Sequence, residues 1–194
     1  KYSLTLDKEM TAYTGLVTLV QLSACILGDK NRMSYDAGIS YIKNVLEATK
    51  TLLKNPNDLD TRSIIMMGAS LSTSSRLGIG KEEAYAYDIY ELEFLPEKLF
   101  GSSYRRSLTS IFPRFLEAMG KRHKEDVRKY YLDVFGFDSS IEESSRKLVA
   151  LFSDFGVDMY YDGIINREQV GCIPCDTELD ENEIFEMING LIRK

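Results

Sequence analysis

Gly15-Leu-Val-Thr-Leu-Val-Gln-Leu-Ser-Ala-Cys-Ile-Leu-Gly28 is the most apolar stretch of this 194-residue chain. Its apolar residues lie on nearly all sides of a helix, which predicts a central, buried helix over residues 7–27. Gly28 is a suitable residue to end that helix. The stretch is too short to span a bilayer, and Thr18, Gln21 and Ser23 make it too polar.

Outward from this helix, the apolar residues keep a helical spacing almost throughout. Helix breaks and caps divide the rest of the chain. The next predicted helix covers residues 33–54 and ends at Asn55-Pro56, and a third begins at residue 58 or 60 and runs to residue 77, followed by the turn Gly78-Ile79-Gly80. Further helices are predicted over residues 81–95, stopped by Pro96; 104–119, capped by Ser103 and kinked at Pro113; and 124–135. Ser140-x-x-Glu143 opens a helix over about 140–155, and a last helix follows a loop of about 20 residues.

The last predicted helix opens at Asp180-x-x-Glu183, with Arg193 and Lys194 at its negative end. No strand–helix–strand alternation, glycine-rich phosphate loop or internal repeat is present in the sequence. We therefore expect an all-α bundle of about seven to nine helices, forming a single domain over residues 1–194 without a nucleotide-binding domain.

Composition excludes several function classes. The chain carries 24 Lys and Arg against 30 Asp and Glu, a net charge of −6, which argues against nucleic-acid binding and against binding to anionic membranes. Three cysteines are too few for a disulfide scaffold and favour a reducing, cytoplasmic location.

Leu22-Ser-Ala-Cys25 matches a bacterial lipoprotein box, but the apolar run continues past the cysteine, so a buried first helix is the preferred interpretation.

Short motifs leave few candidates for chemistry. Cys172-Ile-Pro-Cys175 is compatible with a redox pair, half a zinc site or inert loop thiols, and the last is favoured because the pair is predicted to lie in a loop. His123 is the only histidine, which excludes a multi-histidine metal centre, and we expect it to be solvated. Asp88 and Glu91 share a helix face, where a solvated acidic face is favoured over a cation site.

The order of several segments resembles the helical domain of the iron-containing alcohol dehydrogenases, in the butanol-dehydrogenase-like branch. The similarity covers nearly the whole chain. The segments that carry it are Lys1-Tyr-Ser-Leu-Thr-Leu-Asp-Lys-Glu-Met-Thr-Ala-Tyr-Thr-Gly15; Asn55-Pro-Asn-Asp-Leu-Asp-Thr-Arg62 with Ile65-Met-Met-Gly-Ala-Ser-Leu71; Leu108-Thr-Ser-Ile-Phe-Pro113; Tyr130 to Gly136; and Leu179-Asp-Glu-Asn-Glu-Ile184.

The resemblance implies a cofactor chemistry that the residues here do not match. The family uses iron or zinc, held by one Asp and three His, to polarise an alcohol for hydride transfer to NAD(P). Those ligand positions fall on Thr18, Leu22, Asp88 and Ser102, and a further catalytic His position falls on Leu92. Only Asp88 retains a strong ligand, so we expect no metal, no NAD(P) and no catalytic residue in this chain.

Three functional hypotheses follow from the resemblance. The first is a degenerate, catalytically silent module that binds a protein partner or assembles with its own copies. The second is the C-terminal fragment of an NAD(P)-dependent alcohol dehydrogenase. The third is a small-ligand binding module that uses the family's former cleft, predicted to be lined by Thr18, Leu22, Tyr87, Asp88 and Leu92 and made more apolar by the leucines.

Overall fold

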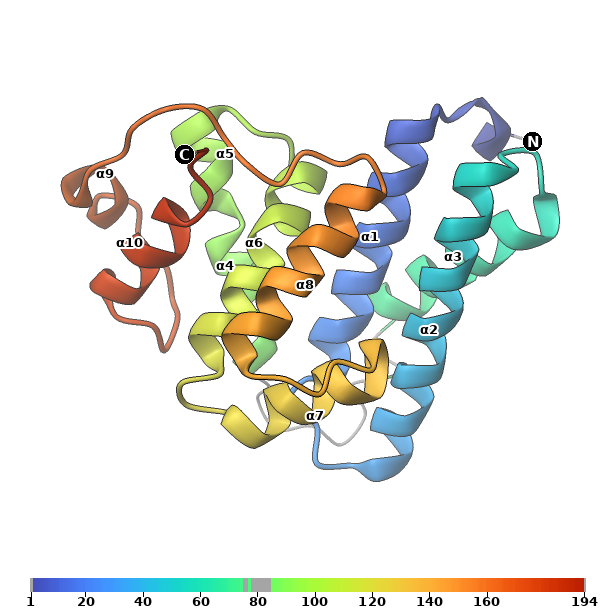
Figure 1. The fold of residues 1–194 in the computed structure, drawn as a ribbon, viewed down its shortest axis with the longest axis horizontal. Coiled ribbons are helices and arrows are strands. Elements are labelled where there is room, and N and C mark those ends of the chain that lie inside the picture. The colour runs from blue at the N-terminus through green and yellow to red at the C-terminus, as the bar shows by residue number, and fades with distance from the viewer. Residues whose placement is uncertain (1, 75–76, 78–84, 194) are drawn as a thin grey trace. The chain divides into compact units, whose positions relative to one another are not determined.

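The computed structural model describes residues 2–74, 77 and 85–193. The described residues form helices and no strand, which confirms the predicted all-α class (Figure 1). They divide into two compact units: unit 1 comprises Lys1–Ala86 and Asp154–Val157, and unit 2 comprises Tyr87–Ser153 and Asp158–Lys194. The single domain expected over residues 1–194 stays a prediction.

Unit 1 is built around the predicted central helix. A short 3-10 helix, η1 (Tyr2–Thr5), precedes α1 (Lys8–Ile26), which packs against α2 (Arg32–Lys54) and α3 (Leu59–Thr73). Asp7 caps α1 by accepting a 2.7 Å hydrogen bond from the Met10 backbone N–H. Most of α1 is buried, as an apolar helix surface requires, and Gly28 follows it with a φ of +77°.

Close approach of α1 and α2 depends on a glycine. A Cβ placed on Gly15 would lie 2.1 Å from Thr49 Oγ1, so the two helix backbones pack at a distance that only glycine permits. The predicted end of the third helix at Leu77 was too late, because α3 ends at Thr73. The predicted turn at residues 78–80 lies outside the described residues.

Unit 2 holds the remaining helices. They are η3 (Tyr85–Asp88, which begins in unit 1), α4 (Ile89–Leu92), α5 (Phe94–Phe100), α6 (Tyr104–Met119), α7 (Lys124–Phe135), α8 (Ile141–Asp154), α9 (Arg167–Gly171) and α10 (Glu181–Asn189). Helices α4, α5 and α10 pack against α6. The buried rings of Phe112 and Tyr130 meet edge to face, with centroids 6.2 Å apart, which joins α6 to α7.

Three predicted elements of unit 2 were wrong. One helix over residues 81–95 is instead η3, α4 and α5, with residues 81–84 outside the described part. Pro96 does not stop a helix; it lies in the first turn of α5, where a missing N–H is tolerated. The long loop contains α9, opened by a capping box of Asn166 and Gln169. Arg193 was predicted to lie at the negative end of the last helix. It lies four residues after α10 ends at Asn189, and it pairs with Asp158.

The other predicted bounds in unit 2 were close. The structure confirms α6, capped by Ser103, and α7. At the start of α8 the Ser140 hydroxyl accepts from the Glu143 N–H at 3.2 Å. Asp180 and Glu183 form the full predicted capping box at α10. No described helix has the length and apolar character needed to cross a membrane.

Candidate functional site

The first two residues predicted at family ligand positions lie inside unit 1, on α1. Thr18 is 2% exposed and its hydroxyl donates to the Thr14 carbonyl at 2.9 Å, while Leu22 is fully buried. Both pack against Gly68 of α3, where an added Cβ would lie 3.1 Å from Thr18 Cγ2 and 3.6 Å from Leu22 Cδ1. These side chains therefore serve the helix packing of unit 1, and Leu22 offers no donor atom.

The other two positions lie in unit 2 and are engaged in hydrogen bonds. Asp88 Oδ2 accepts from the Thr177 hydroxyl at 3.0 Å and from the Glu178 backbone N–H at 3.2 Å. Asp88 thereby holds the loop that precedes α10. The Ser102 hydroxyl lies 2.9 Å from the Tyr161 hydroxyl and donates to the Ser103 carbonyl at 3.3 Å.

The predicted pocket draws on both units. Thr18 and Leu22 belong to unit 1, and the other three predicted lining residues belong to unit 2. Within unit 2, Tyr87 is 42% exposed, Asp88 is half-buried and Leu92 is fully buried. A shared pocket for the five residues stays a prediction.

The donor set does not fit an iron or zinc centre. Leu22 has no lone pair to give, and the hydroxyls of Thr18 and Ser102 are weak, neutral ligands for either metal. The one carboxylate, on Asp88, already accepts two hydrogen bonds. In the part of the chain that the structure describes, no three His, Cys, Asp or Glu side chains gather closely enough to hold an ion.

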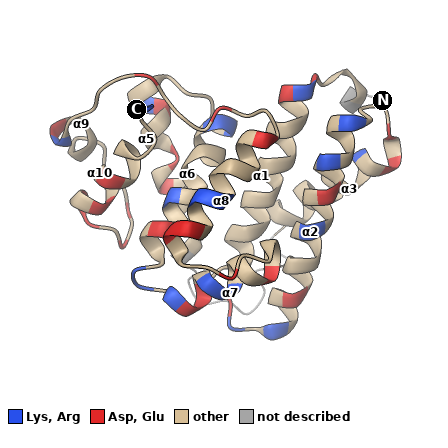
Figure 2. Ribbon diagram, viewed as in Figure 1, with Lys and Arg blue, Asp and Glu red and all other residues tan. Residues whose placement is uncertain are grey.

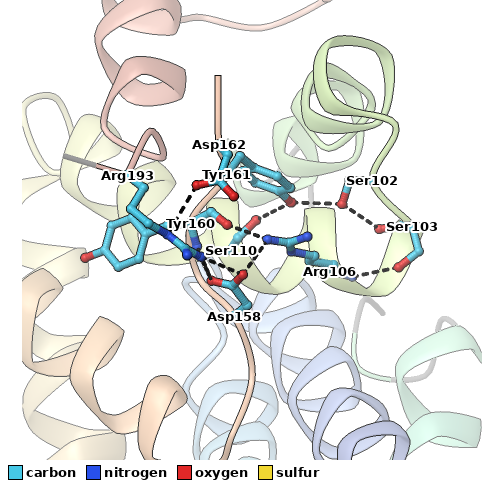
Figure 3. A network of polar contacts seen from close by, with 9 residues as sticks. All are labelled: Ser102, Ser103, Arg106, Ser110, Asp158, Tyr160, Tyr161, Asp162 and Arg193. Atoms are coloured by element: carbon cyan, nitrogen blue, oxygen red, sulfur yellow. Dashed lines mark hydrogen bonds and ion pairs between the residues drawn. The ribbon is translucent and has the colours of Figure 1, made fainter. Parts of the chain in front are cut away.

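A polar network around Asp158 was missed by the sequence analysis (Figure 3). The Asp158 carboxylate accepts from Arg106 Nη2 at 2.8 Å and from Arg193 Nη2 at 2.9 Å, which ties α6 to the residues after α10. Arg106 also donates to the Tyr160 carbonyl. The network therefore links three segments that are far apart in the sequence.

Tyr161 is the centre of the buried side of this network. Its hydroxyl lies 2.9 Å from both Ser102 and Ser110, its ring stacks on Phe100 with centroids 4.6 Å apart, and the Arg106 guanidinium lies 4.4 Å from its ring centroid. Cation–π and aromatic contacts of this kind stabilise a fold. The hydroxyl of Ser102, the residue predicted at the family's fourth ligand position, is thus part of a structural network.

The two loop cysteines differ in environment. Cys172 is exposed at the end of α9, and Cys175 is half-buried; both are free thiols. Burial, and secondly the negative charge of Glu91, raises the pKa of the Cys175 thiol. A raised pKa lowers the thiolate fraction, which is the reactive form. This favours an inert thiol at Cys175.

His123 has a partner that the sequence analysis did not foresee. Its Nε2 lies 2.8 Å from Glu178 Oε1 just before α7, and its side chain is 29% exposed, so the solvated ring stays a prediction. The neighbouring Arg122 donates to both carboxylate oxygens of Glu183, one of them at 2.8 Å, and this hydrogen bonding lowers the pKa of Glu183. These contacts join the start of α7 to the start of α10.

Glu93 is a buried carboxyl that no sequence motif indicated. It lies between α4 and α5, is 3% exposed, and its Oε2 has no hydrogen-bond partner. Burial, together with the charge and hydrogen bonding of Glu97, raises the pKa of Glu93 to about 7. Its position between Leu92 and Leu95 in an apolar run was the available signal of burial.

Known proteins match this arrangement of helices in structure. NADH-dependent butanol dehydrogenase A from Thermotoga maritima superposes with a TM-score of 0.81 and 14% identity, over 98% of this chain and 54% of that one. An iron-containing alcohol dehydrogenase from Corynebacterium glutamicum gives 0.66 and 14%, over 97% and 54%. The chain has the helical fold of the iron-containing alcohol dehydrogenases.

The aldehyde reductase YqhD from E. coli shares this fold, with a TM-score of 0.70 and 17% identity over 82% of this chain and 43% of the other. The chain thus spans about half the length of these solved proteins. Neither protein-family models nor curated protein sequences match it. The fold resemblance expected from the sequence is therefore confirmed, and the chemistry has to be argued from the residues.

Proposed function

We propose that this chain is a catalytically silent version of the iron-containing alcohol dehydrogenase helical fold that acts as a binding or assembly module. The observation that supports the proposal is how the structure engages the side chains that the resemblance assigns to the family's ligand positions. Leu22 is packed in a core, and Asp88 and Ser102 are hydrogen-bonded within unit 2. Without a bound divalent cation, nothing at these positions stabilises an alkoxide during hydride transfer.

A metal titration tests the catalytic half of the proposal. Isothermal calorimetry of the full chain with Zn²⁺, and with Fe²⁺ under anaerobic conditions, should show no stoichiometric sub-micromolar binding. Stoichiometric sub-micromolar binding that is lost in Asp88→Asn would overturn the proposal. NAD(P)-dependent oxidation of small alcohols should be undetectable in the same preparation.

An exposed apolar face of α3 supports the assembly half. Leu59, Ile64, Met66 and Met67 are 56%, 39%, 62% and 63% exposed, and residues 63–74 contain no charged side chain. Exposed apolar patches of this kind mark interaction surfaces. Because each copy carries a net charge of −6, an uncharged face is where two copies meet with least repulsion, so the proposed occupant is a second copy of the chain.

Light scattering coupled to gel filtration tests self-assembly. The chain should be dimeric, and Met67→Lys should shift it to a monomer by placing a charge in the interface. Met33→Lys is the matched control, because Met33 is 82% exposed on α2 and should leave the dimer intact. A monomer at every concentration, or equal effects of both variants, would contradict a dimer through α3.

The second candidate function is the helical part of a longer NAD(P)-dependent oxidoreductase. The observation that favours it is the match to 54% of the length of an NADH-dependent butanol dehydrogenase. Sequencing the transcript upstream of the codon for Lys1 decides between the two. An in-frame nucleotide-binding domain, with aldehyde-dependent NAD(P)H oxidation by the complete product, would establish the longer enzyme.

The third candidate is a module that binds a small ligand in the former cleft. It rests on the resemblance, which assigns Leu22 to a ligand histidine of the family and Leu92 to a catalytic histidine. A thermal-shift panel of nucleotides, metals and small alcohols tests it. Stabilisation by a neutral alcohol that Leu92→Ala abolishes would support it.

We place the module in the cytoplasm, because all three cysteines are free thiols in the structure.

A further inference from the structure

Unit 2 contains an open groove with a volume of about 680 Å³. Its walls come from the end of α6 with the turn that follows, from one face of α7, and from the first residues of α8 with the loop before them. None of its lining residues is one that the resemblance assigns to a ligand position of the family. The groove is therefore a feature of this chain that the proposed function does not use.

Three basic side chains line this groove: Lys121, Lys124 and Arg128. All three residues are exposed, and Figure 2 shows Lys and Arg in the turn before α7 and on α7 itself. Lys124 and Arg128 are four residues apart on α7, so their side chains share one face of the helix, where like charges repel each other. An anion held between the two side chains would remove that repulsion.

The pairing of charges on α7 sets these two residues apart. The helix has three basic residues, and Lys129 is paired, with its Nζ 2.5 Å from Asp133 Oδ2. No Asp or Glu in the described part of the chain forms an ion pair with Lys124 or Arg128. The two basic residues of α7 that line the groove are thus the two that lack an acidic partner.

The two acids in the lining, Glu117 and Glu142, are engaged with other groups. Glu117 Oε2 lies 3.0 Å from Arg114 Nη1. The pKa of Glu142 is lowered, first by a hydrogen bond from its own backbone N–H and then by the Ser140 hydroxyl, while the charge of Lys124 contributes least. Glu142 therefore acts as an anion at the start of α8, and we do not count that helix end as part of the site.

We propose that this groove binds a small phosphate monoester, with the phosphoryl group between Lys124 and Arg128. The planar guanidinium of Arg128 matches two phosphoryl oxygens, and the ammonium of Lys124 acts as a point charge for the third. A phosphate monoester carries a charge of about −1.5 to −2 near pH 7, which balances two cations. A carboxylate carries a single charge and would leave one of the two cations without a counter-charge.

The size and the remaining lining of the groove indicate what the phosphoryl group is attached to. A volume of about 680 Å³ lies within the range of roughly 300–1,000 Å³ that is typical of small-molecule sites, and it exceeds what an inorganic anion needs. The hydroxyls of Ser139 and Ser140 lie on the α8 side of the groove. Hydroxyls both donate and accept hydrogen bonds, which suits the hydroxyls of a sugar. Glucose 6-phosphate is therefore the appropriate probe.

Calorimetric titration of the full chain with glucose 6-phosphate at low ionic strength tests the proposal. We expect saturable binding at one site, weakened about tenfold or more in Lys124→Met and in Arg128→Met, as for loss of a charged hydrogen bond. Lys129→Met is the matched control, because it removes the same charge from the same helix at a residue that pairs with Asp133 and does not line the groove. It should leave the affinity unchanged.

The three substituted side chains are exposed, so each variant should fold, and circular dichroism with thermal melting checks this. Glucose should not bind, and inorganic phosphate should bind more weakly than glucose 6-phosphate. The proposal is overturned by the absence of saturable binding, by equal binding of glucose, by inorganic phosphate that binds as tightly as the ester, or by equal losses in Lys129→Met and Arg128→Met. The metal titration and the dimer measurement report on other residues, so their outcomes are independent of this one.

Discussion

Replacing Glu93 by Gln should stabilise the protein above neutral pH. The Glu93 side chain is buried between α4 and α5, its Oε2 has no partner, and its pKa is raised to about 7, first by burial and then by Glu97. An ionised carboxylate is therefore unfavourable at this position in the folded state. Gln has nearly the same shape, can donate to Glu97 as the protonated acid does, and carries no charge.

The magnitude follows from the two pKa values. In the unfolded chain the Glu93 pKa is ordinary, 4.5, and in the folded chain it is about 7. At about 1.36 kcal/mol per pKa unit the difference corresponds to an upper limit of about 3 kcal/mol. Since the folded pKa is the higher one, the unfolded chain releases its proton first. The free energy of unfolding therefore falls as the pH rises from about 4.5 to about 7, and levels off above.

Urea unfolding followed by circular dichroism, from pH 4 to pH 8.5, measures this effect. Glu93→Gln should match the wild type near pH 4 and be up to about 3 kcal/mol more stable at pH 8. Glu91→Gln is the matched control, because Glu91 is exposed two residues earlier. Parallel pH profiles for wild type and Glu93→Gln, or a less stable Glu93→Gln at pH 8, would refute the reasoning.

Three further predictions concern single positions. Gly15→Ala should lower the free energy of unfolding by about 1–3 kcal/mol in urea, because its Cβ would lie 2.1 Å from Thr49 Oγ1; an unchanged midpoint would contradict the close packing. Asp180→Ala should cost about 1 kcal/mol in the same assay, because the cap of α10 loses its acceptor. Iodoacetamide should alkylate Cys172 faster than Cys175, as read by mass spectrometry, because Cys172 is exposed and burial raises the pKa of Cys175.

Local sequence patterns predicted the helices well where a cap or a break fixes the boundary. Asp58, Ser103 and Asp180 accept hydrogen bonds at three helix starts, as side chains of this type do in short-range motifs. Helix boundaries after α3 were harder to predict, because a proline such as Pro96 is compatible both with the end of one helix and with the first turn of another.

Tertiary contacts explain what the sequence did not reveal. Arg62 and Glu93 are buried although charged residues are mostly exposed, and no local pattern identifies such exceptions. The resemblance placed Ser102 at a former ligand position. Its partner Tyr161 is 59 residues away, so the hydrogen bond between them depends on how the chain returns to α6.

The contact between Tyr161 and the residues after α10 has a consequence for biosynthesis. Tyr161 donates its backbone N–H to Leu191 at 2.8 Å and accepts from the Arg193 N–H at 2.9 Å. On the ribosome, unit 1 has all but four of its residues once Ala86 has emerged. The backbone hydrogen bonds of Tyr161 in unit 2 cannot form until residue 193 has left the exit tunnel. In nascent chains halted before that point, we therefore expect proteases to cleave the residues of unit 2 while unit 1 is folded and resists cleavage.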